Sequence, residues 1–189
     1  VENVVPICGS AKCSGHNWLF LESLAVALEA DSVFDSGRYT EYPQAGMDAF
    51  CAIYAAWAYS QEFFRQDGFK NLELKSHKEM SSILAQVFVP QDPNDLLVRT
   101  RAWQNADISD NLKYNGNLEA ALAGIKARAI VMPSSTDQYF YSDDNKDEVG
   151  GMTNAEFREI PSMWGHVAGL GIDAADREFI DNAIRELLS

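Results

Sequence analysis

The chain has 189 residues, of which 47% are hydrophobic and 23% are charged. This composition is typical of a globular domain and not of a disordered segment. The formal net charge is −13 at pH 7, so the broad positive field that binds phosphate backbones is missing and we expect no nucleic-acid partner. No apolar run approaches the roughly 20 residues of a membrane-spanning helix. We therefore expect a soluble, cytoplasmic protein with no membrane partner.

The first residues form an apolar segment with no polar lead-in. The chain opens on Val1, and residues 4–8 read Val-Val-Pro-Ile-Cys, a pattern that predicts a buried strand. Nothing in this segment resembles a signal or transit peptide. We expect the chain to begin in the middle of a sheet whose other strands lie outside it.

The three cysteines are Cys8, Cys13 and Cys51. Their odd number and the lack of a C-x-x-C pair indicate neither a disulfide framework nor a zinc site. We expect buried or incidental thiols and no bound metal.

Residues 15–117 are predicted to be mainly helical. Trp18, Leu21, Leu24 and Leu28 recur at helical spacing and predict a helix over 17–30. Further helical segments are expected over 47–65, over 72–89, and from a cap at Asn94 or Asp95 through Gln104.

Residues 118–189 have the pattern of α/β structure. A short helix is expected over 118–125, a buried strand over 126–132, a weaker strand over 157–160 and a terminal helix from Ala174. The acidic segment 142–148 is expected to be a solvated surface turn and not a cation site. Three short strands are fewer than the roughly five or six of a typical sheet, so the first strand needs neighbours from elsewhere.

Two side chains follow the predicted strands in a pattern that indicates acid–base chemistry. Asp137 comes after the strand over 126–132, and His166 comes after the weaker strand. Loops at the carboxyl ends of parallel strands carry the sites of α/β folds. A carboxylate beside a histidine fixes the imidazole tautomer and stabilises the imidazolium formed during proton transfer. His16 and His77 lie in polar surroundings and are expected to be surface residues.

The sequence lacks a conventional nucleophile for this pair. In α/β-hydrolases the nucleophilic serine lies on a G-x-S-x-G turn. No Ser or Cys has Gly at both required positions; Ser10 follows Gly9 directly but has Cys8 and Lys12 at those positions. The nucleophile is therefore either unconventional or absent from this chain.

Several motifs resemble the C-terminal half of the homoserine O-acetyltransferase-like branch of the α/β-hydrolase superfamily, over essentially the whole chain. The motifs are Val4–Ser10, Gly15–Asn17, Phe20–Glu22, Tyr54–Gln61, Trp103–Gln104, Asp107–Ser109, Lys126–Arg128, Ser134–Phe140 and Ile160–His166. The resemblance implies an α/β fold consisting of the last parallel strands of an α/β-hydrolase plus a helical lid, incomplete without an N-terminal half. Residues 1–14 and 118–189 would form the core part, and residues 15–117 the lid. The resemblance also makes Asp137 and His166 triad members and implies that the serine precedes Val1, on the same or a separate chain.

The implied activity is acyl transfer or ester hydrolysis on a small ester or acyl donor and an acceptor. No cofactor is expected to be bound, although acyl-CoA is a possible co-substrate, and a homodimer is possible. The basic pairs that homoserine acetyltransferases carry on the first lid helix are missing here, which makes homoserine a doubtful acceptor. Tyr54, Trp57 and Tyr59 could line an acyl or acceptor pocket or simply pack in the lid. The arginines of the lid, Arg65, Arg99 and Arg101, are expected to be solvated.

The alternative function is a non-catalytic one. In that case the chain is a truncated fragment, or a module of the same fold that binds a small ligand. The missing G-x-S-x-G turn is the feature that favours this alternative.

Overall fold

The computed structural model describes all residues from Val1 to Ser189, and they fold into two compact units. The first unit contains Val1–Lys12, Ala58–Phe63 and Asp107–Ser189. The second contains Cys13–Trp57 and Phe64–Ala106. The assignment of residues 15–117 to a lid concerns function and stays a prediction.

The first unit is built on a three-stranded parallel sheet of order β1-β2-β3. The strands are β1 (Asn3–Val4), β2 (Arg128–Val131) and β3 (Ala155–Phe157). Isolated bridges extend the pairing at Ile7 with Met132 and at Ser134 with Ile160. Three parallel strands are thus confirmed, but the prediction of a buried strand over 4–8 was wrong in extent and in burial. β1 ends at Val4, which is exposed, residues 5–7 are half-buried, and only Cys8, whose φ of 46° leaves the extended conformation, is buried.

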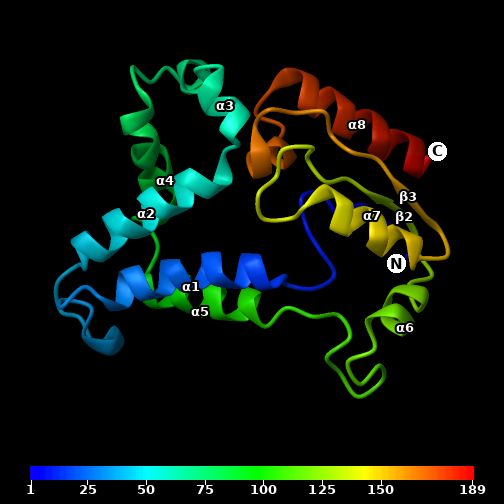
Figure 1. Cartoon of the computed structure of the whole chain (residues 1–189), viewed down its shortest axis with the longest axis horizontal. Helices are drawn as coiled ribbons and strands as arrows, with labels where there is room; N and C mark the ends of the chain where they lie inside the picture. Colours follow the sequence, from blue (N-terminus) through cyan, green and yellow to red (C-terminus); the bar gives the residue numbers. More distant parts are fainter. The chain divides into compact units, whose positions relative to one another are not determined.

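The first unit also contains the helices α6 (Leu118–Ala123), α7 (Ser142–Gly150) and α8 (Ala174–Leu188). In the sequence, α6 directly precedes β2. Ile180, Ala183 and Leu187 are the buried apolar residues of α8, which contacts β2 (Figure 1). The predicted terminal helix is therefore confirmed. The prediction of a surface turn over 142–148 was wrong: these residues form most of α7, which contacts β3. Asn145 and the half-buried Glu148 tie α7 to the chain near Gly9 and Ala11.

The second unit is helical. Its elements include α1 (Gly15–Glu29), α2 (Gln44–Ala58), α4 (Met80–Phe88) and α5 (Pro93–Gln104), with short 3₁₀ turns η1 (Asp35–Gly37), η2 (Gly68–Leu72) and η3 (His77–Glu79). The chain has no helix that combines the length and the apolar character needed to cross a membrane.

Three predicted helix limits were wrong for local reasons. The helix expected over 47–65 is two helices, α2 and α3 (Gln61–Arg65), because the Ser60 hydroxyl accepts a hydrogen bond from Phe63 N at 2.9 Å and starts a new helix. Asp92, and not Asn94 or Asp95, caps α5, with Pro93 at the first helical position. Only the later part of 72–89 is α-helical, from Met80.

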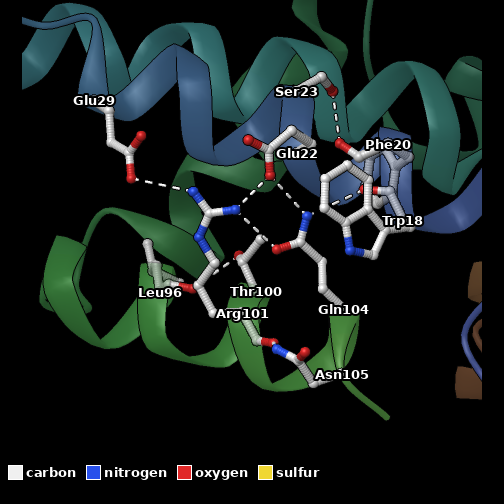
Figure 2. Close-up of polar contacts among 10 residues, drawn as sticks. All are labelled: Trp18, Phe20, Glu22, Ser23, Glu29, Leu96, Thr100, Arg101, Gln104 and Asn105. Atoms are coloured by element: carbon white, nitrogen blue, oxygen red, sulfur yellow. Dashed lines mark hydrogen bonds and ion pairs between the residues drawn. The ribbon is translucent and has the colours of Figure 1, made fainter. Parts of the chain in front are cut away.

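Polar side chains join α1 to α5, which lie side by side (Figures 1 and 2). Glu22 accepts hydrogen bonds from Gln104 Nε2 at 2.9 Å and from Arg101. Arg101 also pairs with Glu29 at 3.3 Å. These bonds lower the pKa of Glu22 and raise that of Arg101. Arg65 and Arg99 are exposed as predicted, but Arg101 is half-buried in this network, so the prediction of a solvated side chain was wrong for it.

Candidate active site

Asp137 lies in the loop that follows β2, and its own backbone contacts hold it there. Its Oδ1 accepts hydrogen bonds from the backbone N–H of Tyr139 at 2.8 Å and of Phe140 at 3.2 Å. The Asp137 N–H donates to Ser134 O at 3.1 Å. A carboxylate that accepts from the chain two and three residues ahead closes a tight local turn. The side chain is 0% exposed, so it can meet only groups that the fold brings to it.

His166 lies in the loop after β3, at the start of the 3₁₀ turn η4 (Gly165–Leu170). Gly165 before it has a φ of +67°, and a Cβ at this position would lie 2.8 Å from both Ala58 O and Ser60 N. Only glycine tolerates both the left-handed backbone and this approach. The glycine thus allows the chain carrying His166 to pack closely against the segment at Ala58–Ser60, which belongs to the same unit.

The two loops bring Asp137 and His166 together. His166 Nδ1 lies 3.0 Å from Asp137 Oδ2. In the tautomer that donates Nδ1–H to the carboxylate, the Nε2 lone pair is left free to accept a proton. The imidazole is 26% exposed and is flanked by the rings of Tyr139 and Phe140, with centroids 4.7 and 5.5 Å away. The geometry is that of an oriented general base.

Hydrogen bonds between the loops fix this pairing. Thr136 Oγ1 donates to Ser162 O at 2.7 Å and accepts from Gly165 N at 3.1 Å. Ser135 Oγ and the Ser162 backbone are also within hydrogen-bond distance, at 3.2 Å. The Ser162 hydroxyl in turn donates to Asp176 of α8 at 2.6 Å, and burial raises the pKa of that carboxyl. Our sequence reasoning gave no role to these supporting residues, because each is an ordinary loop residue until the two loops are seen together.

Cys8 completes the buried surroundings of the pair. Its sulfur, a carboxylate oxygen of Asp137 and a ring nitrogen of His166 all lie within 4.8 Å of one another. This is the one cluster of three such groups in the structure that is compact enough to surround a cation. Burial raises the pKa of the Cys8 thiol to about 12, so this thiol keeps its proton at neutral pH when no metal is bound. We interpret the cluster as an acid–base site because His166 and Asp137 are hydrogen-bonded to each other, and the absence of a metal stays a prediction.

The other predicted residues take different positions. His16 and His77 are exposed, as expected, with rings near Trp57 and Phe69 respectively. Tyr54 lies in the second unit and lines a cavity of about 170 Å³ between α1, α2, α4 and α5. The role of these aromatic residues in substrate binding stays a prediction.

Trp57 and Tyr59 differ from each other in surroundings. Trp57 lies in the second unit with its ring 5.1 Å from that of Phe20. Tyr59 lies in the first unit, is 2% exposed and has its ring 4.7 Å from that of Phe63. The Tyr59 carbonyl accepts a hydrogen bond from Gln138 Nε2 at 2.8 Å, next to Asp137 in sequence. Tyr59 thus supports the loop of Asp137 through its backbone.

No serine of the chain completes the site. Asp137 is the only side chain of this chain that hydrogen-bonds to His166. Ser10 is exposed, and its hydroxyl donates to Lys12 O at 2.8 Å instead. The pair of Asp137 and His166 therefore has no serine of this chain hydrogen-bonded to its imidazole.

Comparison with solved structures identifies the fold. The chain superposes on the acetyl esterase MekB with a TM-score of 0.95 and 35% identity, covering 100% of this chain and 55% of that one. An acetylester hydrolase from Corynebacterium glutamicum gives a TM-score of 0.93 at 32% identity, covering 99% and 54%. The fold is thus the C-terminal part of an α/β-hydrolase, as predicted.

Curated relatives agree with this class. Ethyl acetate hydrolase of Pseudomonas veronii is 35% identical over 192 residues, which cover 100% of this chain and 54% of that enzyme. A probable esterase of Corynebacterium glutamicum is 32% identical over 190 residues, covering 99% and 54%. Homoserine O-acetyltransferase of Nitrobacter hamburgensis is 30% identical over 208 residues, covering 100% and 51%. No protein-family model matches the chain.

The chain spans about half the length of the curated relatives it matches. These comparisons support the α/β-hydrolase superfamily, and they support esterases more strongly than homoserine O-acetyltransferases.

Proposed function

We propose that the full-length protein hydrolyses short-chain acyl esters, and that this chain supplies the acid and the base of a Ser-His-Asp triad. The observation that carries the proposal is the 3.0 Å contact between His166 Nδ1 and the fully shielded carboxylate of Asp137. The esterase names of two relatives with more than 30% identity support hydrolysis over transfer to an amino-acid-like acceptor.

The proposed reaction has two half-reactions. A serine hydroxyl from outside residues 1–189 attacks the ester carbonyl while His166 Nε2 accepts its proton, and the tetrahedral intermediate collapses as the imidazolium returns the proton to the leaving alkoxide. Water then attacks the acyl-enzyme and gives its proton to Nε2. Collapse of the second intermediate releases the carboxylic acid and restores the serine, which recovers the proton. Asp137 stays ionised and stabilises the imidazolium in both halves.

Acyl transfer would use the same residues with an alcohol in place of water. The identity of 30% to a homoserine O-acetyltransferase supports acyl transfer as the second candidate function. Acceptor chemistry separates the two, because only the second half-reaction differs.

The test uses the full-length protein with an acetyl ester in water, with and without a primary alcohol, and a parallel assay with acetyl-CoA and homoserine. We expect free acetate as the main product and no acetylhomoserine. Acetylhomoserine as the main product would replace the hydrolase by the transferase. If His166→Ala keeps both the hydrolase and the transferase activity, both candidate functions are wrong.

A further inference from the structure

Cys8 has an unusual position four residues after the end of β1, next to the isolated bridge between Ile7 and Met132. Its backbone is left-handed, with a φ of 46°, a conformation uncommon for a residue other than glycine. Its N–H still donates to Met132 O at 3.0 Å, which keeps the segment joined to β2. The residue as a whole is 6% exposed. The strained backbone turns the chain out of the sheet next to the loop that carries Asp137.

Gly169 in η4 leaves room for the Cys8 side chain. A Cβ at position 169 would lie 2.9 Å from Cys8 Sγ and 3.2 Å from Cys8 Cβ. A side chain at 169 would therefore displace the sulfur from its place beside Asp137. The turn that carries His166 and the segment that follows β1 thus pack closely around this thiol.

The surroundings of the sulfur favour the neutral thiol. Burial and then the charge of Asp137 raise the pKa of the Cys8 thiol to about 12, while the nearby backbone of Ser134 and Gly169 opposes that rise. The thiol therefore stays protonated at neutral pH. The ionised Asp137 carboxylate, which has an oxygen within 4.8 Å of the sulfur, can only accept a hydrogen bond, so it is the charged acceptor near the S–H group.

We infer that Cys8 is a positioning residue, whose neutral thiol donates to the Asp137 carboxylate and so moderates the pull of that carboxylate on His166. The inference rests on the proposed function, since it assigns a role within the same acid–base site. Asp137 would then hold its own loop through Oδ1, orient the imidazole through Oδ2 and share some of its charge with the thiol.

The inference predicts a change in pH dependence when the thiol is removed. A carboxylate that loses a hydrogen-bond donor attracts the imidazolium more strongly. In the full-length protein, Cys8→Ala should move the acid limb of the kcat/KM profile to higher pH by about half a unit, with KM for the ester unchanged. Two other titratable groups lie near the Asp137–His166 pair. The ring of Tyr139 packs against His166, and Asp176 accepts a hydrogen bond from Ser162 in the loop before His166.

Two further variants control the experiment. Cys8→Ser keeps a donor and should leave the acid limb at or below its wild-type position. Cys51→Ala removes another buried thiol, 1% exposed, from α2 in the other unit, and should not move the limb at all. A general loss of stability would lower the rate without producing this ordered set of shifts.

A second readout does not depend on turnover. The His166 Nδ1–H proton, shared with Asp137, gives a downfield proton NMR signal that reports the strength of that bond, and we expect Cys8→Ala to move it further downfield and Cys8→Ser to restore it. If the wild-type protein hydrolyses no ester, the proposed function fails while the NMR comparison still decides the role of Cys8. An unchanged acid limb in an active, folded Cys8→Ala protein, or an unchanged NMR signal, would overturn the inference. If Cys8→Ala does not fold, Cys8→Ser serves as the test. A shift of its acid limb to higher pH, or of its NMR signal further downfield, would overturn the inference.

Discussion

Asp137 uses its two carboxylate oxygens for different tasks, and one of them is directed at His166. Oδ2 lies 3.0 Å from His166 Nδ1, while Oδ1 accepts from the N–H groups of Tyr139 and Phe140. The Asp137 side chain therefore binds both its own loop and the imidazole of His166. A carboxylate held in this way needs no rearrangement when charge develops on the imidazole.

The first prediction concerns the base. His166→Ala in the full-length protein should lower kcat for a short-chain ester by roughly 10³- to 10⁶-fold, because no other side chain of this chain is paired to accept the serine proton. His77→Ala is the matched control, since His77 is exposed and lies in the other unit. Steady-state kinetics of both variants check the prediction. Near-wild-type turnover without His166 would contradict it.

The second prediction concerns the acid. Asp137→Asn keeps the shape of the side chain but reverses the preferred tautomer of His166, and we expect a loss in kcat of roughly 10⁴-fold with little change in KM. Asp143→Asn, at an exposed position of α7, should leave kcat unchanged. An equal loss in the two variants would show that net charge, and not the orientation of the imidazole, is what matters.

The third prediction concerns the backbone before the base. Gly165→Ala forces a Cβ into Ala58 O and Ser60 N at a φ of +67°, and we expect it to cost about 2 kcal/mol or more in the free energy of unfolding. Gly150→Ala is the control, because nothing lies within 4 Å of a Cβ there and alanine favours the helix by up to about 1 kcal/mol. Urea unfolding of the two proteins gives the comparison. Equal stabilities would contradict the close approach at Gly165.

The fourth prediction concerns the network in Figure 2. A double-mutant cycle with Glu22→Gln and Arg101→Met should give a coupling of about 1 kcal/mol or less, because both side chains remain about one-third exposed. The pKa of Glu22 is lowered in the folded protein, so its contribution is present above the ordinary pKa of a glutamate and is lost as the pH falls through the lowered value. The cycle at pH 7 and near pH 3 tests this sign. A coupling that grows on acidification would contradict it, and the exposed pair of Arg38 with Asp35 should show almost no coupling at either pH.

The sequence predicted the parts of the site that depend on order along the chain. Parallel strands end at one edge of a sheet, so an acid after one strand and a histidine after the next could be expected to meet, and Asp137 and His166 do meet. Periodicity likewise predicted α1 and α8 to within about two residues of their observed limits.

The remaining features depend on contacts that no local pattern reveals. The segment 142–148 was predicted to be a turn. It is a helix that packs against β3, and its Asn145 and Glu148 are hydrogen-bonded to Gly9 and Ala11. Cys8 looked like an ordinary buried thiol, and only its left-handed backbone and the nearby Gly169 place it beside Asp137. Arg101 looked solvated because its partners, Glu22 and Glu29, lie more than 70 residues away in sequence.

The most direct test of the account is where a serine-directed fluorophosphonate attaches to the full-length protein. Peptide mass spectrometry should find the label on one serine outside residues 1–189, and His166→Ala should slow its attachment by at least about 10²-fold, because the base that activates the serine is gone. Label on Ser10 or another serine of this chain, or labelling at an undiminished rate in His166→Ala, would contradict the claim that this chain supplies the acid and base for a nucleophile located elsewhere.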